Sequence, residues 1–104
     1  MSKRKDPDYL SDIREAIQRI AAYTAGMTFE QFMKDNKTQD AVVRNLEVIG
    51  EATKNLSDHL RKTSTQIPWR DLAGMRDKMI HHYFGINYEI VWTIVQEELS
   101  GLLP

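Results

Sequence analysis

Residues 38–56 read TQDAVVRNLEVIGEATKNL, and this segment is the strongest indication of the fold. Its core-type positions recur at intervals of three and four residues, which is the spacing of one face of an α-helix. These positions are Val42, Leu46, Ile49, Thr53 and Leu56. Gly50 lowers the helix propensity inside the stretch, and a glycine in such a place most often permits close packing of another helix. We therefore expect a long helix with one face in a core.

Helical spacing also dominates on both sides of this stretch. Asp6-Pro7 is a good helix start, with Asp6 as the N-cap, and this first helix ends near Gly26. Residues 28–31 fit a capping box that opens a short helix. Residues 57–67 are polar and irregular, and we expect a loop. A fourth helix is predicted from Pro68 to about Phe84, and a fifth follows the N-cap Asn87.

The expected fold is all-α, an up-and-down four-helix bundle with one additional short helix, because short connections favour antiparallel neighbours. The length of 104 residues predicts a single domain over 1–104. The last helix has a broad apolar surface that includes Trp92. This surface suggests an oligomer, although a wide core stripe explains it nearly as well.

Composition limits the classes of function. Hydrophobic residues make up 41% and charged residues 28%, as in ordinary globular proteins, and the net charge is −1. A strongly basic nucleic-acid binder is not indicated, so any RNA contact must come from a local patch or from two subunits together. Cysteine is absent, which excludes disulfides and thiolate sites. No signal peptide or membrane-spanning run is recognisable, so we expect a cytoplasmic protein without a membrane partner.

Residues 76–83 read RDKMIHHY and carry three reactive groups. Arg76 can clamp a phosphate with a fixed fork of donors. His81 can move protons near neutral pH. Tyr83 offers a hydroxyl that can be modified or can bond to a ligand. Together these groups suit phosphodiester chemistry.

On an ideal helix the three groups do not converge. Arg76 and Tyr83 are seven residues apart and share a face, whereas His81 lies about 140° round the axis from Arg76. A long arginine side chain, a loosening of the helix near Gly85, or a second copy of the octet across a two-fold axis could each bring the groups together. The spacing alone does not choose among these.

Simpler roles compete for the same charged residues. Arg76 alone could form a surface salt bridge with Asp77, Glu47 or Glu51. Arg44, Glu47 and Glu51 follow one another at helical spacing, which is typical of an ion-paired, solvated face. The functional alternative is that this line borders the groove of Arg76 and positions or neutralises it.

Histidine and tyrosine have simpler roles as well. His81 or His82 alone could interact with the dipole at a helix end, and Tyr83 alone could be a core or interface aromatic. A metal site is not indicated, because His81 and His82 are adjacent, His59 lies in the predicted loop, and no His-x-x-x-His pair occurs. There is also no glycine-rich phosphate loop and no nucleophile elbow.

Taken together, the residues resemble the HEPN superfamily, and more closely the HepT-type toxins, whose motif is Arg-x4-His-x-Tyr. Here the motif is Arg76, His81 and Tyr83, and its spacing selects His81 over His82. The resemblance spans nearly the whole chain. Its flanking segments are RNLEVIGEA at 44–52, IPWR at 67–70 and HYFGI at 82–86.

The resemblance implies an all-α dimer in which two motifs face a shared cleft. It implies a metal-independent ribonuclease without a cofactor, acting as the toxin of a type VII toxin–antitoxin module. The implied partner is an MNT-type nucleotidyltransferase antitoxin, which transfers AMP to Tyr83, and a larger toxin–antitoxin assembly is possible. An RNA substrate, tRNA or mRNA, is implied as well.

Roles for the matched residues follow from the chemistry of RNA cleavage. His81 is expected to be the general base or acid and Arg76 the phosphate clamp, with Asp77 as a candidate for orienting a catalytic group. AMP on Tyr83 would add negative charge and repel RNA. Two alternatives remain: a non-catalytic subunit that binds a nucleotide or the nucleotidyltransferase, and a plain helical interaction protein with a chance octet.

Overall fold

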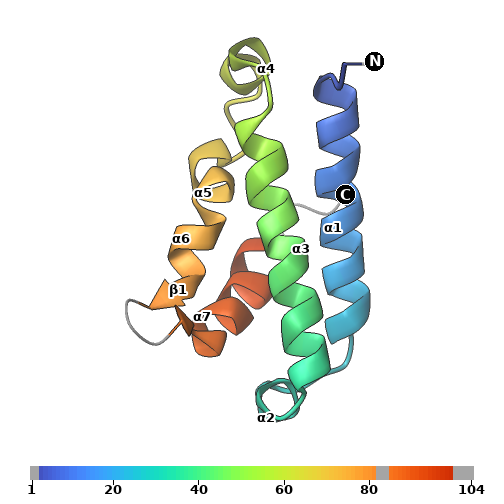
Figure 1. Cartoon of the computed structure of the whole chain (residues 1–104), viewed down its shortest axis with the longest axis vertical. Coiled ribbons are helices and arrows are strands. Elements are labelled where there is room, and N and C mark those ends of the chain that lie inside the picture. Colours follow the sequence, from blue (N-terminus) through green and yellow to red (C-terminus); the bar gives the residue numbers. More distant parts are fainter. Residues whose placement is uncertain (1–2, 82–84, 100–104) are drawn as a thin grey trace.

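Two long antiparallel helices form the frame of the molecule. A computed structural model describes residues 3–81 and 85–99, with only the backbone of His81. Helix α1 covers Asp6–Thr24 and helix α3 covers Asn36–Lys54, and they pack side by side along their length (Figure 1). The sequence pattern predicted both helices, and α3 begins and ends about two residues earlier than expected.

The start of α1 differs from the prediction by one residue. Lys5 is the N-cap, and its backbone N–H donates to the Asp8 carboxylate over 2.9 Å. The Asp6 carboxylate instead accepts hydrogen bonds from the backbone N–H and the hydroxyl of Ser57, at 2.9 and 2.6 Å. Asp6 therefore joins two segments that are far apart in the sequence.

The predicted capping box at residues 28–31 is confirmed. Helix α2 covers Phe29–Met33. The Thr28 hydroxyl accepts from the backbone of Gln31 at 3.1 Å, and the Gln31 side chain accepts from the backbone of Thr28 at 2.9 Å. The helix lies between the ends of α1 and α3.

Residues 57–67 are not wholly a loop, contrary to the prediction. They contain helix α4, Asp58–Thr63, capped by the Ser57 hydroxyl, which accepts from the backbone of Leu60. An Arg61–Asp58 ion pair of 2.8 Å lies on the same helix. None of its residues is fully buried. The segment therefore lacks the apolar residues at helical spacing from which this helix could have been predicted.

The predicted fourth helix is shorter than expected and is divided. Helix α5 covers Trp69–Ala73, Gly74 interrupts it, and helix α6 covers Met75–Met79. Strand β1, Ile80–His81, then pairs antiparallel with strand β2, Gly85–Ile86.

Two features near residue 85 explain why α6 stops before Phe84. The backbone N–H of Asn87 donates to the Met79 carbonyl over 2.8 Å, which returns the chain to the helix end. Gly85 has φ +76°, a conformation that favours glycine.

The last predicted helix is present as two consecutive segments. Helix α7, Tyr88–Thr93, is capped by the Asn87 side chain as expected, and a π-helical segment η2, Ile94–Leu99, continues it. Its buried residues are Val91, Ile94, Val95 and Leu99.

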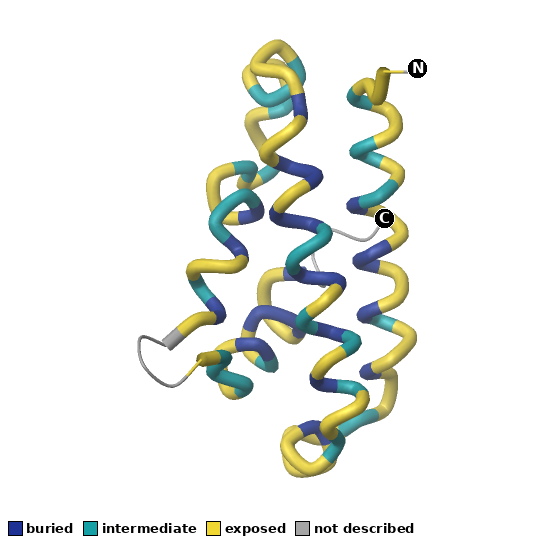
Figure 2. The backbone as a smooth tube through the Cα atoms, viewed as in Figure 1, coloured by how far each residue is buried: buried dark blue, intermediate teal, exposed yellow. Residues whose placement is uncertain are grey.

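The core lies between the α1–α3 pair and the later helices (Figure 2). The core-facing positions predicted for the α3 segment are confirmed: Val42, Leu46, Ile49, Thr53 and Leu56 are all buried. The all-α class is confirmed, with the β1–β2 ribbon as a small addition. No helix among the described residues is both long and apolar enough to cross a membrane.

Candidate functional site

Arg76 projects from the short helix α6 and is exposed. No hydrogen bond or ion pair joins its guanidinium to any described residue. The salt bridges considered from the sequence, with Asp77, Glu47 or Glu51, are therefore not formed within the described part of the chain. An exposed guanidinium without a carboxylate keeps all its donors for a ligand such as a phosphate.

Helix α6 is held by contacts on two sides. Met75 and Met79 are fully buried and anchor its inner face. Lys78 forms an ion pair of 2.8 Å with Glu98 on η2 and lies 3.8 Å from the carboxylate of Asp71 on α5. Asp77 is exposed and forms no bond with another described residue.

His81 lies on strand β1 rather than on a helix, and its backbone is paired with Gly85. The prediction that Arg76 and His81 share one helix is wrong, because α6 ends at Met79. The helical angle of about 140° between them therefore does not apply. His82 and Tyr83 lie outside the described residues.

Arg44, Glu47 and Glu51 come together on the outer face of α3, as their spacing predicted. They border an open groove of about 200 Å³ whose opposite wall is α1, with Tyr9 and Asp12. Glu51 pairs with Lys54 at 3.5 Å. Neither Glu47 nor Glu51 forms an ion pair with Arg44.

Gly50 shows how α3 faces the motif-bearing helices. A Cβ at Gly50 would lie 3.5 Å from the Leu72 carbonyl and 3.6 Å from Met75 Cβ. The glycine thus turns toward α5 and α6, at distances that would also accommodate the Cβ of an alanine. The carboxylates of Glu47 and Glu51 lie instead on the side of α3 that borders the groove with α1.

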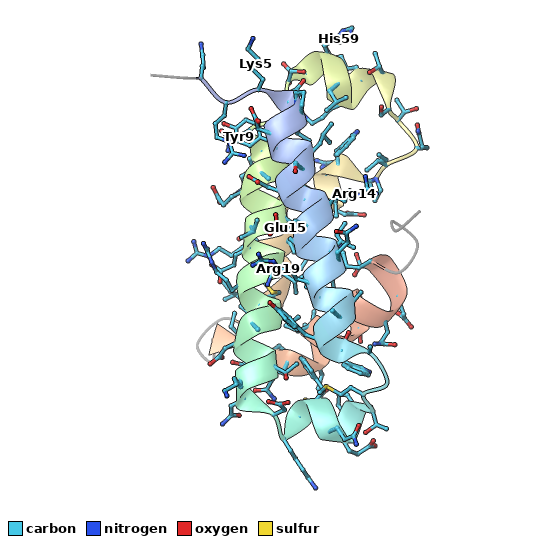
Figure 3. The ribbon with its side chains drawn as sticks, turned by 90° about the vertical axis from the view of Figure 1, so that its right-hand side faces the viewer. Lys5, Tyr9, Arg14, Glu15, Arg19 and His59 are labelled. Atoms are coloured by element: carbon cyan, nitrogen blue, oxygen red, sulfur yellow. The ribbon has the colours of Figure 1, made fainter. Side chains whose placement is uncertain are left out.

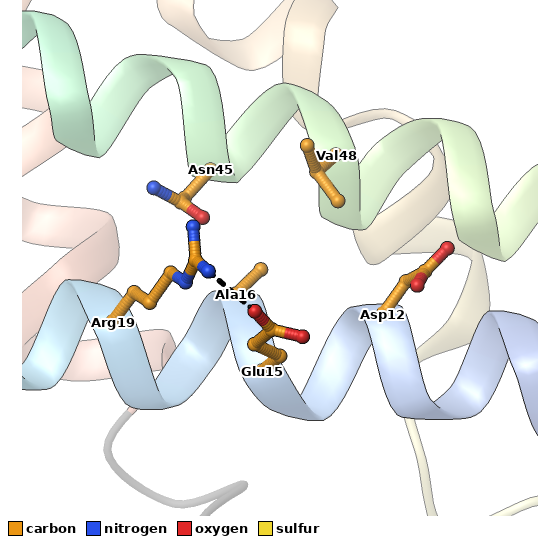
Figure 4. A pocket seen from close by; sticks show the side chains of 6 residues that line it. All are labelled: Asp12, Glu15, Ala16, Arg19, Asn45 and Val48. Carbon is orange, nitrogen blue, oxygen red and sulfur yellow. Dashed lines mark ion pairs between the residues drawn. The ribbon is translucent and has the colours of Figure 1, made fainter.

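A second open groove of about 230 Å³ adjoins the first along α1 and α3. Its polar lining includes Asp12, Glu15, Arg19 and Asn45, and Arg19 is ion-paired with Glu15 (Figures 3 and 4). The sequence reading missed these residues, although Asp12, Glu15 and Arg19 recur at helical spacing on the polar face of α1.

The α1–α3 face carries charges of both signs. The two grooves are lined by four carboxylates and two guanidinium groups. These are Asp12, Glu15, Glu47 and Glu51 against Arg19 and Arg44. Arg4 and Lys54 pair with Asp12 and Glu51, so the charges of this face are balanced and it offers no strongly basic patch to a polyanion.

The described residues contain no group of three His, Cys, Asp or Glu side chains that could hold a metal ion. His59 lies on α4 at the end of the molecule where α1 begins (Figure 3), whereas β1 lies toward the other end (Figure 1). His59 and the strand that carries His81 therefore lie toward opposite ends of the molecule.

The carboxyls with clearly shifted pKa values lie at helix starts. The hydroxyl and backbone N–H of Ser57 lower the pKa of Asp6 below its usual value. The hydroxyl and backbone N–H of Thr38 do the same for the pKa of Asp35, the N-cap of α3. Both shifts reflect hydrogen bonds to the charged form and serve the fold rather than catalysis.

Comparisons with known proteins agree with the sequence pattern. Residues 13–104 match the family described as "Ribonuclease HepT-like". A protein of Thermococcus cleftensis, provisionally named ribonuclease HepT, is 48% identical over 100 residues, which cover 96% of this chain and 91% of that protein. A provisionally named RNase of Methanocaldococcus jannaschii is 54% identical over 95 residues, covering 91% and 78% respectively. No solved structure matches the chain significantly.

Proposed function

Because the chain belongs to the HepT-like ribonuclease family, we propose that it is an endoribonuclease that cleaves RNA through Arg76 and His81 without a metal ion. The family supports RNA as the class of substrate. The assignment of the two residues rests on the motif spacing and on the surface around α6.

One structural observation carries the assignment: the exposed guanidinium of Arg76 has no partner among the described residues. A phosphate ligand needs a free fork of donors, and the motif spacing distinguishes Arg76 from other exposed arginines, such as Arg14 and Arg70, that are also unpaired within the described chain. The backbone of His81 follows α6 directly on β1. A phosphate bound by Arg76 would therefore lie beside the strand that carries the proposed proton donor or acceptor.

RNA supplies its own nucleophile in this proposal. His81 removes the proton of a 2′-hydroxyl, the 2′-oxygen attacks the adjacent phosphorus, and the bond to the 5′-oxygen breaks. The departing 5′-oxygen takes a proton from a general acid, which the partner's copy of the motif could supply in a dimer. Arg76 stabilises the negative charge that develops on the phosphate oxygens.

The proposal extends to regulation and assembly. The chain acts in the cytoplasm as the toxin of a toxin–antitoxin module and forms a homodimer. A nucleotidyltransferase antitoxin silences it by transferring AMP to Tyr83, because the added phosphate repels RNA near Arg76. Mass spectrometry of the chain co-expressed with such an enzyme should find AMP increments on Tyr83 and none in Tyr83→Phe.

The first test is removal of the proposed catalytic groups. Arg76→Ala and His81→Ala should each lower the rate of RNA cleavage by at least about a hundredfold, because each removes transition-state stabilisation or proton transfer. Cleavage is measured with purified protein in the presence of a chelator. Arg61→Ala, a change on α4, serves as the control. Unchanged cleavage in both motif variants would contradict the assignment.

A second function is favoured by the charge of the chain. The net charge of −1 and the lack of a strongly basic patch on the α1–α3 face suit a non-catalytic subunit that binds a nucleotide or the nucleotidyltransferase. In that case the purified, unmodified chain would bind the enzyme or a nucleotide and leave RNA intact even at high concentration.

A further inference from the structure

Lys78 links three elements around the proposed site. Its Nζ lies 2.8 Å from Glu98 Oε1 on η2 and 3.8 Å from Asp71 Oδ1 on α5. It stands between Arg76 and His81 in the chain and belongs to the same short helix as Arg76. A change in its contacts would therefore act directly on the segment that carries the motif.

Helix α6 cannot hold its direction by itself. It has five residues, follows the break at Gly74 and leads into the extended backbone of Ile80. A helix of this length is unstable without tertiary contacts. Its buried anchors are Met75 and Met79, and methionine is flexible and adapts to many packings. Apolar burial keeps α6 on the core but restrains its rotation only weakly.

The ion pairs of Lys78 supply a directional restraint. The Lys78 and Glu98 side chains are 33% and 39% exposed, so the pair is partly shielded from solvent. Asp71 brings a third charge, and networks of charges contribute more than isolated surface pairs. The two cations of α6 thus differ: Lys78 is bound to carboxylates, whereas Arg76 is unpaired within the described chain.

We propose that Lys78 is a positioning residue for RNA cleavage. By binding Glu98 and Asp71 it fixes the direction of α6, and with it the placement of Arg76 and of the β1 strand that carries His81. This role rests on the proposed ribonuclease function. Lys78 itself does not touch the substrate.

The test removes the Lys78–Glu98 ion pair and then restores it with the two charges exchanged. Lys78→Met keeps most of the unbranched apolar stem of the side chain and removes its charge. We expect kcat for RNA cleavage to fall about tenfold to a hundredfold, the effect of a misplaced catalytic group, with KM changed less than about threefold. The kcat of Lys78→Glu should fall at least as far. The double variant Lys78→Glu with Glu98→Lys should recover part of the lost kcat, because the pair with residue 98 is restored while Asp71 then faces a second carboxylate.

Arg61→Met is the matched control. Arg61 forms an ion pair of the same 2.8 Å length with Asp58, and its side chain is 34% exposed, but it lies on α4. Its loss should leave kcat unchanged. Equal effects of Lys78→Met and Arg61→Met would overturn the proposal. A rise in KM with unchanged kcat in Lys78→Met, not rescued by the reversed pair, would also overturn it, because it would indicate a phosphate contact.

Amide hydrogen exchange tests the positioning without activity. The Lys78 amide donates to the Gly74 carbonyl and the Asn87 amide to the Met79 carbonyl. Both should exchange about tenfold faster in Lys78→Met, since local opening becomes easier, and should be unchanged in Arg61→Met. Unchanged exchange in Lys78→Met would refute the positioning.

A wild-type chain that left RNA intact would contradict the proposed function, while the exchange comparison would still decide the role of Lys78.

Discussion

At the scale of single residues, Asp6 shows how one carboxylate can hold two distant segments. It joins the start of α1 to Ser57, the N-cap of α4, through two hydrogen bonds. Asp6 was predicted as the cap of its own helix, and its real partner lies 51 positions away in the sequence. Local pattern identified a helix start here, and only the fold decided which groups the carboxylate serves.

The shifted pKa of Asp6 predicts a pH dependence of stability. Its folded pKa is below the ordinary value of 3.8, so the charged form is favoured in the native state. The resulting stability is fully present above that ordinary value and is lost as the pH falls through the lower, folded pKa. The Tm difference between wild type and Asp6→Asn should therefore shrink below about pH 4.

Asp40→Asn is a suitable control for this titration. Asp40 is an exposed aspartate of α3 without a bond to another described residue. Its replacement should alter Tm little at any pH. A Tm difference for Asp6→Asn that stayed constant down to pH 2.5 would contradict the role of the Ser57 bonds.

At the scale of elements, α3 meets the α5–α6 pair at Gly50. Its added Cβ would find ordinary contact distances of 3.5–3.7 Å. Gly50→Ala should therefore stabilise the chain by about 0.5–1 kcal/mol through helix propensity. Gly50→Leu should destabilise it by about 1–3 kcal/mol, because the larger side chain overpacks the contact. Denaturant unfolding measures both changes, and destabilisation by alanine would show that the contact is tighter than described.

The turn at Gly85 is a second element-scale feature. Gly85 and Gly26 have φ of +76° and +71°, and an added Cβ would meet nothing within 4 Å at either. Alanine at each position should cost roughly 1–2 kcal/mol of stability, the price of a left-handed conformation. Only Gly85→Ala should also slow RNA cleavage, since Gly85 pairs with His81. Equal cleavage by both variants would show that the ribbon does not position the motif.

At the scale of the whole molecule, the proposed dimer makes a test of site composition possible. If each site combines Arg76 of one chain with His81 of the other, a mixture of the inactive Arg76→Ala and His81→Ala chains forms some dimers with one intact site. Random exchange of subunits should then restore about a quarter of wild-type cleavage. An inactive mixture would refute a site that needs only one Arg76 and one His81 from different chains.

Much of the fold could be predicted because its determinants are local. The spacing of Val42, Leu46 and Ile49 depends only on helical geometry, so α3 and its core face followed from the sequence. The caps at Thr28 and Asn87 bond within three residues and were equally readable. The spacing of Arg76, His81 and Tyr83 is also local in the sequence, and for this reason it could indicate the family. The single domain over 1–104 and the roles of Arg76, His81 and Tyr83 stay predictions.

The remaining features depend on contacts between distant residues. The helical class, the long helices and their buried faces follow from residue order alone, because periodicity and capping are short-range. Only the tertiary structure decided that α6 ends at Met79, whose carbonyl binds Asn87, and that Lys78 pairs with Glu98. It also left Arg76 without a carboxylate partner in the described chain. Which residues bond to each other depends on which helices and strands pack together. The spacing of residues along the sequence does not contain that information.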